Sequence, residues 1–222
     1  MMPANNTAGI ILANGELNHP ERIRERLREL DIHFVLAADG GAHHASVLEL
    51  HLDSVIGDLD SISNSEKQFF VDAGVTILEV SAQKDETDLE LALLHAIDLD
   101  VERIIILGGT GGRLDMTLSN VTLLSHPAIG SQRLEFWTGN QTTWLITPPG
   151  EGIEGNLGDT LSLIPLFEDA LGVRTMNLAY CLQNEDLPQG PARGVSNVFT
   201  SSNVEVRLNS GSLVATHTTG RA

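Results

Sequence analysis

The chain has 222 residues and a formal net charge of −17, because 30 Asp and Glu residues stand against 13 Lys and Arg residues. Hydrophobic residues make up 41% of the chain, which is enough for a folded core and excludes intrinsic disorder. The acidity argues against nucleic acid and anionic membranes as partners, since binding to both depends on Lys and Arg. Residues 1–147 hold 22 of the 30 acidic residues. These acidic side chains either lie on the solvated surface or form a functional site.

No segment suggests export or membrane insertion. The N-terminal residues lack a basic segment followed by a long apolar run, and no run approaches the roughly 18 apolar residues that a membrane span needs. Cys181 is the single cysteine, which excludes an intrachain disulfide, and we expect it to be a small buried side chain. We therefore expect a cytoplasmic protein.

Short β-branched runs alternate with longer amphipathic runs through the first two-thirds of the chain. In chain order we expect a strand at 10–13, a helix at 20–30, a strand at 33–38, a helix at 41–50, a strand at 53–56, a helix at 65–73, a strand at 75–80, a helix at 86–97, a strand at 103–107 and a helix at 114–124. This alternation predicts an α/β domain over residues 1–147, with an open, mostly parallel sheet flanked by helices.

The pattern changes after Trp144. Residues 148–155 are rich in Pro and Gly and are a candidate linker. Beyond them we expect only short strands, at 160–166, 173–182, 195–201, 204–208 and 212–216. Residues 148–222 are therefore predicted to form a small all-β sandwich or barrel.

Ligands of open parallel sheets bind outside the carboxyl ends of the strands. Each expected strand of the first domain is followed there by glycine, by carboxylates or by both. These segments are Asn14-Gly15, Asp39-Gly40-Gly41, Gly57 to Ser61, Ala82 to Asp88, and Gly108 to Asp115. Their coincidence at one edge of the sheet predicts a functional site.

Asp58 and Asp60 lie two residues apart on a loop and can converge on one hard cation. Mg²⁺ prefers such oxygen ligands, usually one or two carboxylates together with substrate phosphates. Alternatively, Asp60 or Ser61 caps the following helix, which needs no metal. Asp39 is expected at the end of an adjacent strand, and a third carboxylate there favours the metal site over helix capping.

The segment from Lys84 to Asp88 has two interpretations. Asp85 at a helix N-cap, with Asp88 three residues later, resembles a capping box. Asp85, Asp88 and Lys84 are equally placed to face the crevice, and the residues alone leave both interpretations open.

Gly108 to Gly112 would present backbone N–H groups at a helix start, which suits phosphate, although a tight strand–helix turn explains the glycines equally well. The neighbouring Arg113 matches phosphate oxygens with its planar fork, and Asp115 could orient that arginine, hold substrate or cap the helix. Carboxylates, a glycine-rich helix start and one arginine together favour Mg²⁺-dependent phosphoryl-type transfer from a nucleotide.

Four blocks in this order resemble the thiamine pyrophosphokinase family. They are Ala38-Asp-Gly-Gly-Ala42, Gly57-Asp-Leu-Asp-Ser-Ile62, Lys84-Asp-Glu-Thr-Asp-Leu-Glu-Leu-Ala92, and Gly108-Gly-Thr-Gly-Gly-Arg-Leu-Asp115 with Asn120 after it. Gly158 to Pro165 and Gly194 to Asn197 are similar to the second domain of that family. The resemblance implies transfer of the terminal diphosphate of ATP to the hydroxyl of thiamine, giving thiamine diphosphate and AMP. It also implies a homodimer with the active site at the subunit interface.

The resemblance assigns roles by position. Asp58, Asp60 and Asp88 would hold Mg²⁺ and, with Arg113, form the catalytic group. Asp115 would help to orient substrate, and Ser196 and Asn197 would contact thiamine. In addition, the resemblance implies that a further set of residues binds ATP and its metal: Asp39, Gly40, Asp85, Thr87, Gly108, Gly111, Gly112 and Arg113.

Two residues depart from the pattern of the family. Met116 stands where many bacterial relatives have His, and His43 replaces a frequent Asn. Two other functions stay open at this point. One is diphosphate transfer to another alcohol, such as a pterin, and the other is binding of thiamine or a nucleotide without turnover.

Overall fold

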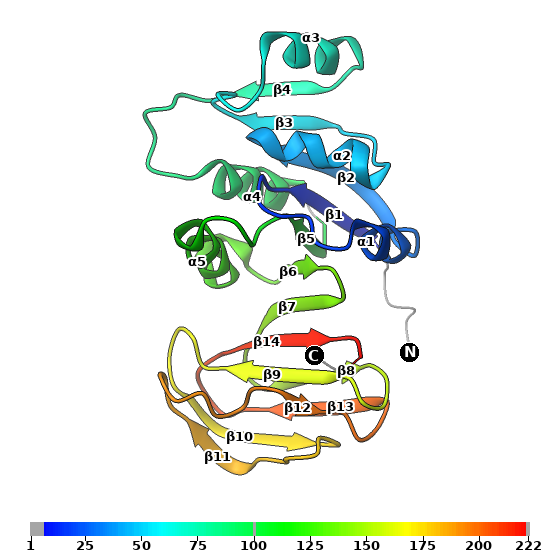
Figure 1. The fold of residues 1–222 in the computed structure, drawn as a ribbon. Coiled ribbons are helices and arrows are strands. Elements are labelled where there is room, and N and C mark those ends of the chain that lie inside the picture. Colours follow the sequence, from blue (N-terminus) through cyan, green and yellow to red (C-terminus); the bar gives the residue numbers. More distant parts are fainter. Residues whose placement is uncertain (1–6, 100, 221–222) are drawn as a thin grey trace. The chain divides into compact units, whose positions relative to one another are not determined.

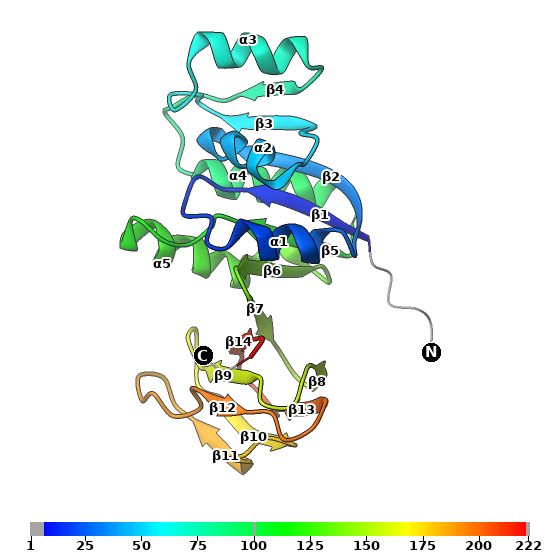
Figure 2. The same ribbon diagram turned by 45° about the vertical axis from the view of Figure 1, so that its right-hand side comes forward.

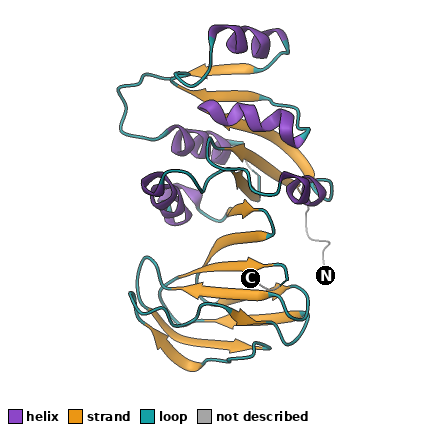
Figure 3. Cartoon of the chain, in the orientation of Figure 1, coloured by secondary structure: helices purple, strands orange, loops and turns teal. Residues whose placement is uncertain are grey.

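The computed structural model describes residues 7–99 and 101–220, which divide into two compact units between Gly139 and Asn140. The sequence suggested a boundary at 147–148. The division falls earlier because residues 141–146 form a strand that pairs along its whole length with residues 213–218 of the second unit. All described helices lie in the first unit, as Figure 3 shows. The part of the chain that the structure describes contains no candidate membrane-spanning helix.

The first unit is built on a parallel sheet with the strand order β6-β5-β1-β2-β3-β4 (Figure 1). Its strands are β1 (Thr7–Leu12), β2 (Asp31–Ala38), β3 (Ser54–Gly57), β4 (Thr76–Glu79), β5 (Arg103–Leu107) and β6 (Arg133–Thr138). The expected mostly parallel α/β sheet is therefore confirmed. Strand β6 was missed, because the charges of Arg133 and Glu135 interrupt its apolar pattern.

Helices cover both faces of this sheet, and Figure 2 shows α1 and α2 in front of it and α4 behind it. The helices are α1 (Pro20–Leu27), α2 (His43–Leu48), α3 (Asn64–Asp72), α4 (Asp88–Asp98) and α5 (Leu114–Thr122), with short 3₁₀ turns at Asp39–Ala42, Leu123–Ser125 and Pro127–Ile129. Helix α4 shows why these segments are helical: Leu89, Ala92, Leu93 and Ala96 recur at helical spacing and are all buried.

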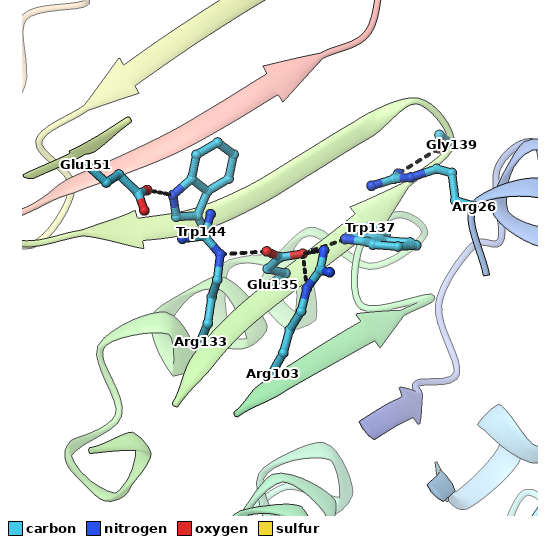
Figure 4. Close-up of polar contacts among 8 residues, drawn as sticks. All are labelled: Arg26, Arg103, Arg133, Glu135, Trp137, Gly139, Trp144 and Glu151. Atoms are coloured by element: carbon cyan, nitrogen blue, oxygen red, sulfur yellow. Dashed lines mark hydrogen bonds and ion pairs between the residues drawn. The ribbon is translucent and has the colours of Figure 1, made fainter. Parts of the chain in front are cut away.

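A buried carboxylate joins β5 to β6 (Figure 4). Glu135 is only 3% exposed and accepts hydrogen bonds from Arg103 at 2.7 Å, from Arg133 at 2.6 Å and from the indole Nε1 of Trp137 at 2.8 Å. Burial acts to raise the pKa of Glu135, but the two arginines outweigh it and hold the pKa below its ordinary value. The guanidinium of Arg26 stacks on Trp137 at 3.6 Å.

The second unit is a sandwich of two antiparallel sheets, which confirms the expected all-β architecture. One sheet contains the strands β7, β14, β9 and β12, and the other contains β8, β13, β10 and β11. The strands are β7 (Gln141–Ile146), β8 (Gly150–Glu154), β9 (Thr160–Ile164), β10 (Ala170–Met176), β11 (Gln183–Leu187), β12 (Asn197–Val198), β13 (Asn203–Arg207) and β14 (Leu213–Thr218). Apolar side chains from both sheets form its core, among them Trp144, Leu161 and Val173.

Two expectations in this unit were wrong. The candidate linker at 148–155 contains β8, whose glycines lie in a strand because each residue of β8 is paired with β13. The strand expected at 173–182 ends at Met176, because Asn177 takes a left-handed conformation with φ of 64° and turns the chain.

Candidate active site

A cavity of about 540 Å³ opens at the carboxyl ends of the first unit's strands. It lies where the order of the sheet reverses, because β1 has β5 on one side and β2 on the other. Segments that follow β1, β2, β3 and β5 line it, together with the start of α4. This is the position at which open α/β sheets bind ligands.

Three carboxylates gather at one wall of this site. One oxygen from each of Asp39, Asp58 and Asp60 lies within 4.8 Å of the others. Asp39 is 6% exposed, and its Oδ1 is buried without a hydrogen-bond partner. A buried, unpaired carboxylate oxygen is costly unless a cation binds it. These residues therefore fit a hard divalent cation.

The turn between β3 and α3 aims two of these side chains. Leu59 is buried and adopts a left-handed φ of 61°, while the Oδ1 of Asp58 accepts the backbone N–H of Asp60 at 3.2 Å. Neither Asp60 nor Ser61 caps α3. Ser63 does so, in a capping box with Glu66. Hydrogen bonds from Ser63 and a further one from His43 lower the pKa of Glu66 to about 2.

Asp88 lies close to Asp39 and lines the same cavity. Gly57 explains this closeness, since a Cβ there would lie 3.0 Å from the Cβ of Asp39 and 3.2 Å from the carboxyl carbon of Asp88. Asp88 opens α4, but the N-cap is Thr87, whose hydroxyl accepts the backbone N–H of Glu90 at 3.2 Å. The capping interpretation of Asp85 is therefore wrong. Asp88 forms an ion pair with Lys84.

The glycine-rich segment also lines the cavity, through Gly109, Gly111 and Gly112. Gly108, Gly111 and Gly112 have φ values of 68°, 91° and 67°, which explains the need for glycine. The N–H of Gly111 donates to the hydroxyl of Thr117 at 3.1 Å. The N–H of Gly112 donates to Oε1 of Glu16, also at 3.1 Å. Two N–H groups of the expected phosphate cradle are therefore already bonded within the chain.

Arg113 and Asp115 stand at the start of α5, where both are exposed. The Arg113 guanidinium donates two hydrogen bonds to the Asp115 carboxylate, at 3.2 and 2.5 Å. This pairing raises the pKa of Arg113 and lowers the pKa of Asp115. Among the roles considered for Asp115, the geometry matches orientation of the arginine.

The structure thus brings together most of the expected first-unit residues around one cavity. Asp39, Asp60, Thr87, Asp88, Gly111, Gly112 and Arg113 line it directly. Asp58 does not line the cavity itself, but its carboxylate lies with those of Asp39 and Asp60. The other expected residues that do not line the cavity are Gly40, Asp85, Gly108 and Asp115.

Asn14, from a segment expected at this edge, also lines the cavity, and so do Glu16, Met116, Thr117 and Asn120, to which no role in the site was assigned from the sequence. Asn120 is buried, donates from Nδ2 to the carbonyl of Gly109 at 2.8 Å, and leaves its Oδ1 without a partner. The sequence pointed to Asn120, which follows the fourth block, and to Met116, which departs from the pattern of the family. Glu16 carried none, since a lone acid in a loop has no diagnostic spacing.

Ser196 and Asn197 lie in the second unit. Ser196 is exposed, with φ of 56°, and its N–H donates to the hydroxyl of Ser162 at 3.0 Å. Asn197 is buried, and its amide bonds the backbone N–H and carbonyl of Tyr180 at 3.0 and 2.7 Å. Asn197, Tyr180 and Arg193 line a second cavity of about 330 Å³. Cys181, expected to be buried, is exposed at its edge.

The fold and site define a two-domain protein in which a parallel α/β domain with an acidic, glycine-lined crevice precedes a β-sandwich. Residues 30–136 match the family model for the catalytic domain of thiamin pyrophosphokinase, and residues 148–213 match the model for its vitamin B1 binding domain. The thiamine pyrophosphokinase of Bacillus subtilis is 31% identical over 165 residues, which cover 73% of this chain and 77% of that protein. The chain belongs to the thiamin pyrophosphokinase family, a family of enzymes, as the sequence blocks indicated.

More distant relatives agree. Thiamine pyrophosphokinase 1 of rice is 24% identical over 168 residues, and the match covers 71% of this chain but only 63% of that protein. Among solved structures, Bacillus subtilis thiamine pyrophosphokinase superposes with a TM-score of 0.84 at 24% identity, covering 96% of this chain and 99% of that one. Yeast thiamin pyrophosphokinase superposes with a TM-score of 0.79 at 19% identity, covering 97% and 87%. At these identities the superpositions establish the fold.

Proposed function

We propose that this protein transfers the terminal diphosphate of ATP to the hydroxyl of thiamine, giving thiamine diphosphate and AMP with Mg²⁺ as the metal. The observation that carries the proposal is the unpaired, buried Oδ1 of Asp39. It lies with Asp58 and Asp60 at a cavity that a glycine-rich helix start also lines. The choice of reaction rests on the membership of the chain in the thiamin pyrophosphokinase family.

Asp39, Asp58 and Asp60 would hold the ion, with Asp88 beside them. When bound, Mg²⁺ neutralises phosphate oxygens and fixes them relative to these carboxylates. Arg113 and the backbone of Gly108 to Gly112 would bind phosphate, with the N–H groups of Gly111 and Gly112 exchanging their bonds to Thr117 and Glu16 for bonds to the ligand. Asp115 keeps the Arg113 fork in one orientation, which suits bidentate contact with an anion.

Thiamine would be bound by the second domain. The match of residues 148–213 to a vitamin B1 binding domain supports this assignment. Ser196 would contact thiamine directly, while the buried Asn197 would act by fixing the backbone of Tyr180. Tyr180 is 76% exposed, so its ring is available to a ligand or to a second subunit.

A homodimer would complete the site. Leu114 and Leu118 are 71% and 59% exposed one turn apart on α5, next to the crevice. Two large apolar side chains at such a position favour an interface with a second copy of the chain.

The test incubates the protein with ATP, Mg²⁺ and thiamine and measures AMP and thiamine diphosphate. Equimolar formation of both supports the proposal. Release of ADP instead of AMP would mean monophosphate transfer and overturn it. Product with a pterin alcohol but not with thiamine would reassign the acceptor, and thiamine binding without AMP release would make the protein a binder.

A further inference from the structure

Glu16 follows β1 and is tied to the glycine-rich segment by its backbone as well as its side chain. The N–H of Gly15 donates to the carbonyl of Gly108 at 2.8 Å, and the N–H of Glu16 donates to the carbonyl of Thr110 at 3.0 Å. From α2, the Nε2 of His44 donates to the carbonyl of Gly15 at 2.9 Å. None of these bonds uses the Glu16 side chain, so the two segments stay joined without it.

The Glu16 carboxylate lies on the glycine turn itself. Its Oε1 accepts the N–H of Gly112 at 3.1 Å, and a Cβ at Gly111 would lie 2.7 Å from the Cβ of Glu16. A Cβ at Gly112 would meet nothing within 4 Å, so this part of the turn is open. Glu16 also lines the cavity. A carboxylate oxygen of Glu16 therefore occupies the N–H of a glycine that lines the cavity.

Glu16 differs from the other acids of the crevice. Asp88 is neutralised by Lys84. Asp39, Asp58 and Asp60 form the group that fits a cation. Within residues 7–99 and 101–220, Glu16 forms no ion pair and belongs to no such group. Its charge is therefore uncompensated at the wall where phosphate would bind.

We infer that Glu16 is a specificity-determining residue that makes the crevice select metal-bound over metal-free polyphosphate. Its carboxylate competes for the N–H of Gly112 and repels an anion whose charge no metal offsets. A metal-bound nucleotide carries less net negative charge and is repelled less. The inference rests on the proposed nucleotide-binding function and adds the discrimination between the two forms of the ligand.

Two variants separate the charge of Glu16 from its hydrogen bond. Glu16→Gln keeps an oxygen for the N–H of Gly112 but removes the charge, whereas Glu16→Ala removes both. Glu25→Gln, at an exposed position on α1 outside the cavity, makes the same change of net charge and serves as the matched control. Thermal unfolding of each variant verifies that the fold is intact.

The experiment measures ATP binding by calorimetry without thiamine, once with excess Mg²⁺ and once with EDTA. In EDTA we expect Glu16→Gln to bind ATP about tenfold more tightly than the unmodified chain, and Glu16→Ala at least as tightly as Glu16→Gln. With Mg²⁺ the gain should fall to about twofold, and Glu25→Gln should match the unmodified chain in both buffers.

Equal or weaker binding by both Glu16 variants in EDTA would overturn the inference and make Glu16 a support of the glycine turn. The same gain with and without Mg²⁺ would also overturn it, because no selection would then exist. Failure of the unmodified chain to bind ATP with Mg²⁺ is a separate outcome that counts against the proposed function.

Discussion

Lys84 forms an ion pair with Asp88 at the start of α4, so an internal cation neutralises the carboxylate that lies beside the proposed metal group. Both side chains are partly buried, at 15% and 28% exposure. The carboxylate oxygens that come together belong to Asp39, Asp58 and Asp60, whereas Asp88 pairs with Lys84. A metal ion that recruits Asp88 must compete with Lys84 for it.

Lys84→Met should strengthen binding of a divalent cation, because it removes the competing charge while keeping an apolar chain of similar length. A partly buried ion pair worth about 1 kcal/mol corresponds to a roughly fivefold lower Kd for Mn²⁺. Electron paramagnetic resonance of free Mn²⁺ measures this without turnover. Lys67→Met is the matched control, since Lys67 pairs with Glu79 away from the cavity. Unchanged Mn²⁺ affinity in Lys84→Met would contradict the prediction.

Asp58→Asn should abolish most of the activity while leaving the fold intact. Asparagine retains an oxygen for the N–H of Asp60, so the turn between β3 and α3 keeps its hydrogen bond. The lost charge removes a metal ligand, and we expect a fall in kcat/KM of about 10²-fold or more. A steady-state assay of AMP release measures the loss of activity, and thermal unfolding shows whether the fold is intact. A variant that unfolds at room temperature would instead show that Asp58 is structural.

Arg113→Lys should lower kcat/KM for ATP by about tenfold, because an ammonium group does not reproduce the two-pronged contact of a guanidinium. Arg113 and Asp115 are exposed at 74% and 65%, so their ion pair contributes little to stability. The melting temperature should therefore stay the same. An unchanged kcat/KM would show that Arg113 does not contact the phosphates.

The sequence predicted the sheet of the first domain because its central strands are continuous apolar runs. Residues 104–107 are buried throughout, as a strand covered on both faces must be. Strand β6 escaped detection because Glu135 stands among its residues, and only the tertiary contacts with Arg103 and Arg133 allow that charge to be buried. Strand β8 escaped because its glycines gave no alternating pattern, and pairing with β13 compensates for this.

The site was predictable where residues cluster in sequence, as in Asp58-Leu59-Asp60 and Gly108 to Gly112. It was not predictable where topology alone brings residues together. Glu16 meets Gly112 only because β1 and β5 are neighbours in the sheet. The sequence left capping by Asp60, Ser61 or Asp85 open as an alternative. Ser63 and Thr87 cap α3 and α4 instead, which leaves Asp60 and Asp88 to the cavity.

Glu135→Gln should destabilise the first domain by about 3 kcal/mol, the cost typical of breaking a buried ion pair from one side. The substitution keeps the size of the side chain but removes the charge that pairs with both Arg103 and Arg133. Urea denaturation followed by circular dichroism measures the loss. Glu102→Gln, at an exposed position near the start of β5, should change stability by about 0.5 kcal/mol or less. Equal stability of the two variants would refute the prediction.

Asp159 should make the β-sandwich sensitive to acid. It is 2% exposed, and its carboxylate accepts the N–H groups of Gly220 and Asn156 at 2.7 and 2.8 Å and pairs with His217 at 2.9 Å. Burial acts to raise the pKa of Asp159, but these hydrogen bonds and His217 together hold it below the ordinary value of 3.8. The ionised form therefore stabilises the fold above that value, and the contribution is lost as the pH falls through the lower folded-state pKa.

Asp159→Asn should therefore lower the free energy of unfolding by about 2 kcal/mol at neutral pH, and the difference from the unmodified chain should shrink as the pH falls below about 4. Urea titrations at a series of pH values between about 7 and about 2.5 measure this difference. The exposed Asp169, which also accepts one backbone N–H, supplies the control Asp169→Asn, whose effect should stay small. A deficit for Asp159→Asn that stays constant with pH would mean that the shape of the side chain, and not its charge, holds β14 and the loop before β9 together.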